Sequence, residues 1–447
     1  MKRSKAVFHM GNSSRANLQL NEEEEDILRG KYGGVLQKVI KTVVLYGQAC
    51  GAKKLVPIEG AAHLVISIAL AGLGLRLEMV DELVHAGLKT KVPFTVDPRP
   101  FDIKNAICSK QQEKLFGELY RNQGYYEKQL KKLGLRDANS FTCTSYLPEV
   151  GNIPKESEVL AWSESSAVIF ANSVLGARTN RNGAVLDLLC NISGRAPYHG
   201  LLTDEGRQAK WLVVVKTSEL PHPQLLGGAI GKKVQEDVPY IIGLDRFLGS
   251  GLNIKTRDFL KDMGASCAAL GACGLYHVEN ITPEALEQER NLLVKDYRTY
   301  IIDSEELKNI RNSYLLLWRN IGAKPKRCLI GCPHLSLQQL GWWTTMINDA
   351  LKSKNKNIVN FEVILCAAPD VIEEFKGKGR VYDQLMRMGV RLSSMCIETF
   401  MNNPLVAREP VITNSNKLRA YTTAKFLLDQ EILEIIAGRE LKKGGME

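Results

Sequence analysis

Apolar residues recur along this chain in two patterns, and the two patterns alternate through most of its length. Apolar positions spaced three or four residues apart predict helices, as over residues 35–50, where Val35, Val39, Val43 and Val44 are so spaced. Compact apolar runs bounded by polar or turn residues predict strands, as over 211–215. Because helices and strands alternate from residue 225 onward, the sequence predicts an α/β fold.

The other expected elements are assigned in the same way. Helices are expected over 64–75, 80–85, 111–133, 229–234, 256–263, 284–303, 304–317, 337–351 and 371–388. Strands are expected over 54–58, 92–96, 167–171, 240–244, 327–331, 361–367, 390–392 and 411–414. The apolar run 167–171 matters most for function, because a dense group of polar residues follows it.

Length and composition narrow the class of protein. The 447 residues correspond to two to four domains, and a content of 45% apolar and 24% charged residues argues against a disordered chain. No stretch approaches 18 uncharged apolar residues, so neither a membrane span nor a membrane partner is expected. The ten cysteines are scattered and form no C-x-x-C pair. This usage favours a reducing compartment, and we expect a cytoplasmic protein.

The charge of the chain is positive but dispersed. Lys and Arg number 59 and Asp and Glu 49, which gives +10. The basic residues form short clusters rather than one stripe, and zinc-finger spacing is absent, so we expect no nucleic-acid partner. Residues 1–20 hold four basic and no acidic residues. We predict a flexible tail there, with a transit peptide as the alternative, and a helix starting in the acidic run 22–26.

The polar group after 167–171 is the most informative segment. Two guanidinium groups and several amides at the end of a strand suit a carboxylate or a phosphate. We therefore predict an anionic-substrate site in this segment. The alternative is an Asn-rich structural loop whose side chains cap its own turns. The candidate substrate-binding residues are Asn172, Ser173, Arg178, Thr179 and Asn180, with Arg181 beside them.

Two other segments place a histidine near a glutamate. His277 lies two residues from Glu279 at a predicted strand end, where the two could act as acid and base. The alternative is that His277 only anchors a loop, while 282–284 begin the next helix. His63 lies four residues after Glu59, so both would share one face if that segment were helical.

Three cysteines lie near the ends of predicted elements. Cys332 follows the strand 327–331, Cys396 follows the strand 390–392, and Cys143 lies between threonines. Strand ends of an α/β sheet can converge on one site, and three thiolates could hold an iron–sulfur cluster with one iron open to substrate. Two alternatives remain, namely three ordinary buried cysteines, or a nucleophilic Cys332 that works with His334.

Taken together, these segments resemble the large, catalytic subunit of the aconitase X family. The resemblance rests on Ala171-Asn-Ser-Val-Leu-Gly-Ala-Arg-Thr-Asn180, Gly274-Leu-Tyr-His-Val-Glu279 and Gly331-Cys-Pro-His334. Thr142-Cys-Thr144, Thr203-Asp-Glu205, Val238-Pro-Tyr240 and Thr413-Asn-Ser415 also fit. The motifs occur in the family's order and cover roughly residues 22 to 421.

The resemblance implies an aconitase-like α/β catalytic region and an Fe–S-dependent hydro-lyase. The family's activities are dehydration of cis-3-hydroxy-L-proline and of mevalonate 5-phosphate. Carried over, it implies Cys143, Cys332 and Cys396 as cluster ligands, of unknown nuclearity. Asn172, Ser173, Arg178, Thr179 and Asn180 then bind a small anionic substrate, while His63, His277 and Glu279 are catalytic candidates without assigned roles. Iron would activate a substrate hydroxyl as a Lewis acid while a base removes a proton.

This chain departs from the family pattern in two places. It lacks the family's swivelling domain, which in the heterodimeric branch is a separate small subunit, so we expect such a partner. We therefore divide the chain into a tail over 1–20, a catalytic region over 21–425, and a C-terminal helix and tail over 426–447. The segment 97–102 differs from the archaeal phosphomevalonate enzymes, which favours the hydroxyproline substrate over mevalonate 5-phosphate. A non-catalytic ligand-binding or assembly subunit is the alternative from another class.

Overall fold

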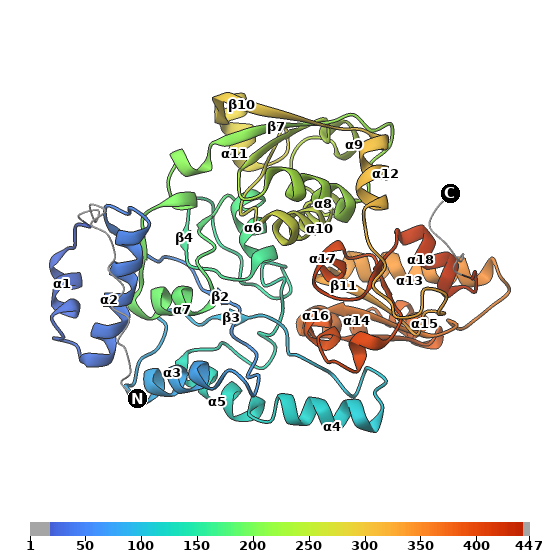
Figure 1. Cartoon of the computed structure of the whole chain (residues 1–447), viewed down its shortest axis with the longest axis horizontal. Helices are drawn as coiled ribbons and strands as arrows, with labels where there is room; N and C mark the ends of the chain where they lie inside the picture. Colours follow the sequence, from blue (N-terminus) through green and yellow to red (C-terminus); the bar gives the residue numbers. More distant parts are fainter. Residues whose placement is uncertain (1–17, 441–447) are drawn as a thin grey trace, which may run out of the picture.

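The computed structural model describes residues 18–440 and is organised around two parallel sheets (Figure 1). The first has the order β10 (Leu293–Ile302), β7 (Ala209–Val215), β8 (Pro239–Ile242), β9 (His277–Val278). The second has the order β13 (Val390–Ser393), β12 (Glu362–Ala367), β11 (Arg327–Leu335), β14 (Val411–Thr413), β15 (Lys425–Phe426). All neighbouring strands in both sheets are parallel. The predicted α/β class is confirmed.

The C-terminal sheet is buried on both faces, which explains the continuous apolar runs of its strands. Ile330 and Leu365 point to the face that also carries α13 (Leu337–Lys352), α14 (Pro369–Gly377), α15 (Arg380–Arg387) and α18 (Asp429–Ile436). Leu329 and Ile364 point to the other face, where they pack with Phe400 of α16 (Ile397–Met401). The remaining helix on this sheet is α17 (Asn416–Tyr421).

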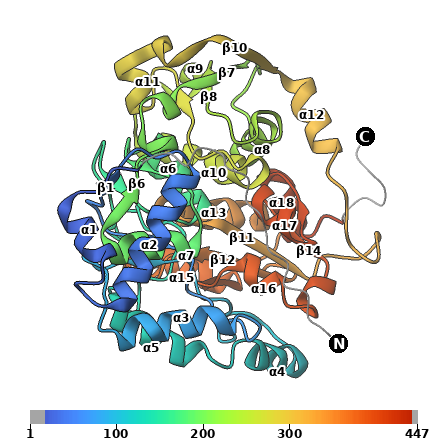
Figure 2. The ribbon, with the colours of Figure 1, turned by 60° about the vertical axis from the view of Figure 1, so that its left-hand side comes forward.

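The N-terminal part is mainly helical and carries only short ladders. Figure 2 brings α1 and α2 forward, and α2 packs against α7. The ladders are β1 (Leu55–Pro57) with β6 (Arg195–Pro197), β2 (His63–Leu64) with β3 (Thr95–Val96), and β4 (Val159–Leu160) with β5 (Arg178–Thr179). The helices are α1 (Glu22–Leu28), α2 (Gly34–Ala49), α3 (Gly74–His85), α4 (Lys110–Leu119), α5 (Gln123–Leu133), α6 (Ser165–Ser173) and α7 (Ala184–Ser193).

Two helices of the middle part pack at very short range. They are α8 (Pro223–Val234) and α10 (Ile254–Gly271), and glycines form their contact. A Cβ atom on Gly231 would lie 2.4 Å from the carbonyl oxygen of Cys267, and one on Gly227 would lie 2.0 Å from that of Met263. Only glycine allows this approach of the two backbones. The shorter helices here are α9 (Asp245–Leu248), α11 (Pro283–Gln288) and α12 (Ser304–Asn312).

Most predicted elements are present, but three assignments are wrong. The run 167–171 lies in α6, because a short apolar run that is buried on all sides cannot be distinguished from a strand. The predicted helix 284–303 is α11, a short 3₁₀ turn and then the strand β10. The predicted helix 64–75 is largely irregular, and its backbone is held by Asp97 and Gln123.

Two predicted helices are each divided in two, and the ends of the chain lie partly outside the structure. Residues 111–133 form α4 and α5, and 371–388 form α14 and α15. The predicted tail over 1–20 falls mostly outside the described residues, although Leu18 is buried and the Gln19 amide donates to Lys53. The predicted C-terminal helix is α18, and 441–447 also lie outside the described part.

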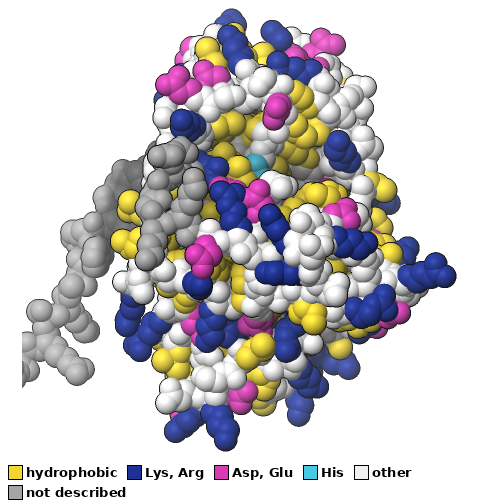
Figure 3. Space-filling model, turned by 90° about the vertical axis from the view of Figure 1, so that its right-hand side faces the viewer, with side chains coloured by type: hydrophobic (Ala, Val, Ile, Leu, Met, Phe, Trp, Pro, Cys, Tyr) yellow, Lys and Arg dark blue, Asp and Glu magenta, His cyan; other side chains and the backbone are white. Residues whose placement is uncertain are grey.

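No helix within residues 18–440 is both long and apolar enough to cross a membrane. Figure 3 shows the face at the right of Figure 1, where basic side chains are interspersed with acidic, hydrophobic and uncharged ones. On that face the positive charge is dispersed rather than gathered in a stripe.

Candidate active site

Three cysteines from distant parts of the chain meet at one edge of the C-terminal sheet. Cys332 lies near the end of β11, Cys396 is the N-cap of α16 directly after β13, and Cys143 comes from a loop of the N-terminal part. Because β11 and β13 are parallel members of one sheet, their carboxyl ends share an edge. The charge of Cys332 acts on the thiols of both Cys143 and Cys396. The structure therefore brings the three predicted cysteines together.

His334 connects the three segments that carry these cysteines. Its backbone N–H donates to Cys143 Sγ over 3.3 Å, its Nδ1 lies 3.0 Å from Thr142 Oγ1, and its Nε2 lies 3.3 Å from the Met395 carbonyl oxygen. Because a carbonyl only accepts, Nε2 carries the proton and Nδ1 accepts from the Thr142 hydroxyl. Burial lowers the pKa of His334 to about 4, so the ring is neutral near pH 7.

The pKa of Cys332 and the hydrogen bonds of His334 argue against a nucleophilic Cys332. Burial raises the pKa of Cys332 to about 11 and that of Cys396 to about 12, and it also raises the pKa of Cys143. A nucleophilic cysteine needs a lowered pKa and a base within reach. The His334 ring is bonded to other partners, so it is not available to Cys332 as that base.

The same three thiols suit a metal centre. None of the ten cysteines forms a disulfide, and a coordinated thiol loses its proton whatever its pKa in the free protein. Within residues 18–440, no group of three His, Cys, Asp or Glu side chains is arranged to hold a single metal ion. Cysteine thiolates are the natural ligands of iron–sulfur clusters, so these three side chains are the ones that could hold such a cluster.

A buried ion pair lies beside the cysteines. Lys417 Nζ is 2.9 Å from Glu164 Oε1, and both side chains are less than a tenth exposed. Burial would lower the pKa of Lys417, but Glu164 and the nearby acidic groups raise it, and Lys417 in turn lowers the pKa of Glu164 to about 2 against the effect of burial. The charges of Cys332, Cys143 and Glu398 all act on Lys417. The sequence motifs did not reveal this pair, although Lys417 lies two residues after the motif Thr413-Asn-Ser415.

His63 lies near the ion pair. Its Nδ1 is 2.9 Å from Thr95 Oγ1, while its Nε2 is buried and has no partner among the described residues. Burial lowers the pKa of His63 to about 4, although the charge of Glu164 acts in the opposite direction. The segment from Glu59 to His63 is not helical, and Glu59 accepts the Val159 N–H instead. A neutral His63 with a free ring nitrogen is therefore available to a ligand or a proton.

Asn172, Ser173 and Thr179 are occupied by their own neighbourhood. The Asn172 side chain donates to the carbonyls of Thr179 and Gly274 and accepts the Thr179 N–H. The Ser173 hydroxyl oxygen accepts the Tyr276 N–H over 2.9 Å. All three side chains are buried. Their polar atoms hold β5 and the segment before β9 against α6.

The other members of that polar segment are similarly bonded. Arg178 pairs with Asp204 at 2.5 Å, and Asn180 donates to the His199 carbonyl and accepts the Leu201 N–H. These contacts match the structural-loop alternative for 172–181. Direct substrate contact by this segment stays a prediction.

His277 and Glu279 belong to a different polar cluster. His277 Nε2 lies 2.8 Å from the Arg207 carbonyl oxygen and its Nδ1 lies 3.6 Å from Glu284. Burial lowers the pKa of His277 to about 4. Glu279 pairs with Arg290 at 2.7 Å. None of these contacts reaches the cysteines, so the structure does not bring this predicted pair to the cysteine site.

Comparison with known proteins identifies the family and the fold of this chain. The chain matches "Aconitase X first domain" over residues 17–205 and "Aconitase X second domain" over 209–312. The crystal structure of Thermococcus kodakaraensis aconitase X in its holo-form superposes with a TM-score of 0.77 and 29% identity, covering 93% of this chain and 99% of that one.

Relatives of this chain carry the names of dehydratases. The phosphomevalonate dehydratase large subunit of Thermococcus kodakarensis is 37% identical over 72% of this chain and 75% of its own length. The phosphomevalonate dehydratase large subunit of Methanocaldococcus jannaschii is 30% identical over 94% of this chain and 100% of its own length. The cis-3-hydroxy-L-proline dehydratase of Pseudomonas aeruginosa is 26% identical over 91% of this chain and 67% of its own length. With these matches along the chain and the matching fold, this protein belongs to the aconitase X family and is a lyase of the dehydratase type.

Proposed function

We propose that this chain is the large, catalytic subunit of a dehydratase that binds an iron–sulfur cluster through Cys143, Cys332 and Cys396. The observation that carries the proposal is the convergence of these cysteines, which lie up to 253 positions apart, around the neutral ring of His334. The surroundings raise the pKa of Cys332 and Cys396, which is unfavourable for a nucleophile. Binding of a cluster is a role that does not need a lowered pKa in the free thiol.

The proposed substrate is a phosphorylated hydroxy acid of the mevalonate 5-phosphate type. Identity to the phosphomevalonate relatives is higher, and the match to the Methanocaldococcus protein extends over all of that protein. The preference for cis-3-hydroxy-L-proline rested on residues 97–102. That segment serves the fold, since the Arg99 carbonyl accepts the Cys396 N–H and Asp102 accepts the Ser393 hydroxyl. It therefore gives no reason to prefer hydroxyproline, which remains the second candidate.

Each residue near the cysteines has a proposed task. When bound, the cluster supplies a Lewis-acidic iron for the leaving hydroxyl. The Lys417 ammonium, fixed by Glu164, supplies a buried positive charge for an anionic substrate. His63 offers the unpartnered Nε2 to a substrate hydroxyl or to a proton in transit. Their burial excludes water from the reacting groups.

A small subunit is part of this proposal. The phosphomevalonate relatives are named large subunits, which supports a partner chain. We propose that the partner supplies the swivelling domain and closes the site over the substrate. The ten free cysteines favour a reducing compartment, in keeping with a cytoplasmic enzyme.

Metal analysis of cysteine variants tests the cluster. Protein purified without oxygen should contain iron and sulfide, and Cys143→Ala, Cys332→Ala and Cys396→Ala should each lose most of both. Cys190→Ala is the matched control, because Cys190 is fully buried in α7 and away from the site. Equal iron content in all four variants would contradict the ligand assignment.

The substrate is tested with the reconstituted pair of subunits. Turnover of mevalonate 5-phosphate, and not of cis-3-hydroxy-L-proline, is the expected result. The reverse preference would retain the dehydratase and reject the phosphorylated substrate. No turnover of either compound by an iron-loaded pair would reject both candidate substrates.

A further inference from the structure

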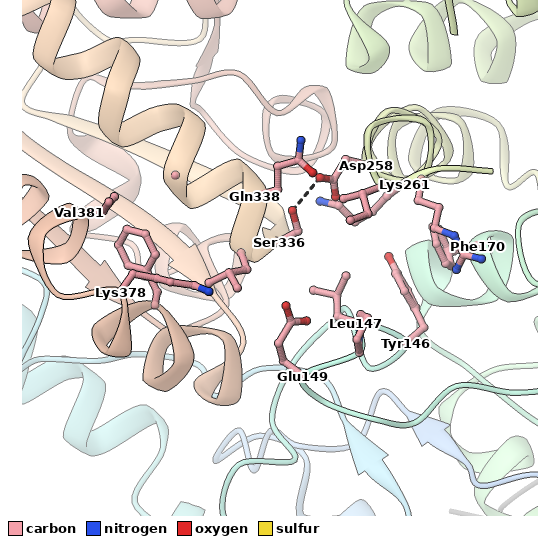
Figure 4. A pocket seen from close by; sticks show the side chains of 16 residues that line it. Tyr146, Leu147, Glu149, Phe170, Asp258, Lys261, Ser336, Gln338, Lys378 and Val381 are labelled. Carbon is pink, nitrogen blue, oxygen red and sulfur yellow. Dashed lines mark hydrogen bonds between the residues drawn. The ribbon is translucent and has the colours of Figure 1, made fainter. Parts of the chain in front are cut away.

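A cavity of about 520 Å³ lies between the N-terminal part, α10 and the helices of the C-terminal sheet (Figure 4). Its wall is mostly apolar and includes Leu147, Phe170, Leu337 and Phe375. This volume lies in the range of sites for small organic ligands. The cavity therefore has the size and lining of a binding site.

The cavity is separate from the cysteine site. None of the three cysteines lines it, nor do Glu164 and Lys417. The β11 backbone at His334 lies between them, because Lys261 on the cavity side donates to the His334 carbonyl over 3.1 Å while the His334 N–H donates to Cys143. A ligand in the cavity would not touch these five residues, although the charges of Cys143 and Glu164 act on the Tyr146 hydroxyl in its wall.

Two polar atoms in the cavity wall are buried and unpartnered. Tyr146, only 3% exposed, stacks on Phe170 and leaves its hydroxyl without a hydrogen bond, and Glu149 Oε2 has no partner either. Figure 4 shows the Glu149 carboxylate pointing into the cavity, with Asp258 across from it. A buried polar atom without a partner is costly, so each of these two is a place where a ligand can bind.

The charged side chains around the cavity indicate which kind of ligand group would bind there. Lys261 is saturated by Asp262, Gln339 and the His334 carbonyl. Asp258 accepts the Ser336 hydroxyl over 2.7 Å and keeps a second oxygen. Arg257 and Lys378 also line the cavity, but both are exposed to solvent, whereas the buried part of the wall presents carboxylate and phenol oxygens, which call for a hydrogen-bond donor, preferably a charged one.

We propose that this cavity binds a small molecule with an apolar body and a primary amino group, whose ammonium bonds Glu149 and Tyr146. The apolar body packs among the aromatic and aliphatic side chains of the wall. The ligand bridges segments from three parts of the chain, so its binding also stabilises their relative positions.

Binding of three matched probes to the whole chain tests this site. 2-Phenylethylamine, 2-phenylethanol and 3-phenylpropionate are titrated by calorimetry or ligand-observed NMR. The amine is expected to bind saturably and about tenfold tighter than the alcohol, since a hydrogen bond to a charged group adds roughly 1.5–3 kcal/mol. The carboxylate is expected to bind weakest.

Two variants locate the binding. Gly341 lines the cavity from α13, and a Cβ there meets nothing within 4 Å, so the backbone accepts a side chain, and Gly341→Leu should occupy part of the cavity and abolish binding. Gly117→Leu, at an equally open position in α4, is the control and should bind normally. Glu149→Gln should remove the preference for the amine and retain the alcohol.

The measurements with the probes and variants can either support or overturn the proposed amine site. Absence of saturable amine binding, amine binding unaffected by Gly341→Leu, or tighter binding of 3-phenylpropionate would each overturn the proposal. Because the readout is binding of probes, it does not depend on the cluster or on turnover.

Discussion

Replacement of Lys417 by methionine should destabilise the protein strongly, because Glu164 would keep a buried and unpaired charge. Lys417 holds the pKa of Glu164 at about 2 rather than the ordinary 4.5, against the effect of burial, and this difference corresponds to about 3 kcal/mol. Removal of one partner from a buried pair costs about 3–5 kcal/mol in other proteins. For a cooperative unit of 150–250 residues, 3 kcal/mol lowers the melting temperature by about 6–12 °C.

The pH dependence gives this prediction a second signature. In the wild type the lowered pKa of Glu164 stabilises the fold above about pH 4.5, and this contribution is lost as the pH falls towards 2. In Lys417→Met the main influence that opposes burial is removed, with only His63 and the Ser166 hydrogen bond left to lower the pKa of Glu164, so that pKa should rise above its ordinary value. The variant should then lose stability as the pH rises above 4.5, so its difference from wild type should widen between pH 5 and pH 7.

Calorimetric melting of both proteins at several pH values measures the effect. The double variant Glu164→Gln/Lys417→Met should melt above Lys417→Met alone, because it removes the unpaired charge. Lys376→Met is the control, since its pair with Glu373 is exposed and contributes at most about 1 kcal/mol. A loss below 1 kcal/mol in Lys417→Met, with no pH dependence, would refute the reasoning.

Three further predictions concern the scaffold. Arg207→Leu should cost about 3–5 kcal/mol in thermal unfolding, because Arg207 donates to both oxygens of Glu284 in a buried cluster; a melting temperature within 2 °C of wild type, a change of roughly 1 kcal/mol or less, would contradict this. Burial raises the pKa of Asp187 to about 8, so the folded state binds a proton that the unfolded state releases, and wild-type stability should fall between pH 5 and pH 8 by up to about 1.4 kcal/mol per unit. Asp187→Asn should remove that slope in a pH series of melting curves, and an unchanged slope would assign it to other groups. Gly231→Ala should cost about 1–3 kcal/mol, because its Cβ would lie 2.4 Å from the Cys267 carbonyl oxygen, and unchanged calorimetric stability would show that α8 and α10 can separate freely.

The cysteine site was predictable because parallel sheets have a regular geometry. Cys332 and Cys396 both follow apolar strand runs, and the carboxyl ends of parallel strands share an edge. Their convergence could therefore be expected from order along the chain. Cys143 lies in an irregular loop, and its place was available only through the family resemblance.

The ion pair and the role of the polar segment could not be predicted from local patterns. Glu164 and Lys417 are 253 positions apart, and no periodicity relates them. The apolar run before Asn172 is buried on all sides as helix α6, which removes the spacing that distinguishes a helix from a strand. His277 resembled an acid–base residue in the sequence because Glu279 lies only two positions away. Its hydrogen-bond partner in the structure is the carbonyl of Arg207, which lies 70 positions away in the sequence.

The hydrogen bonds of His334 have a consequence for the way the protein would acquire the proposed cluster. The Cys143 and His334 segments are 191 positions apart, so closure of the loop between them is entropically costly and belongs to a late stage of folding. Until then the three thiols are dispersed along an open chain, where each can oxidise or bind iron singly. Iron–sulfur assembly should thus act on chains that have already completed the C-terminal sheet, and truncated translation products should accept no cluster.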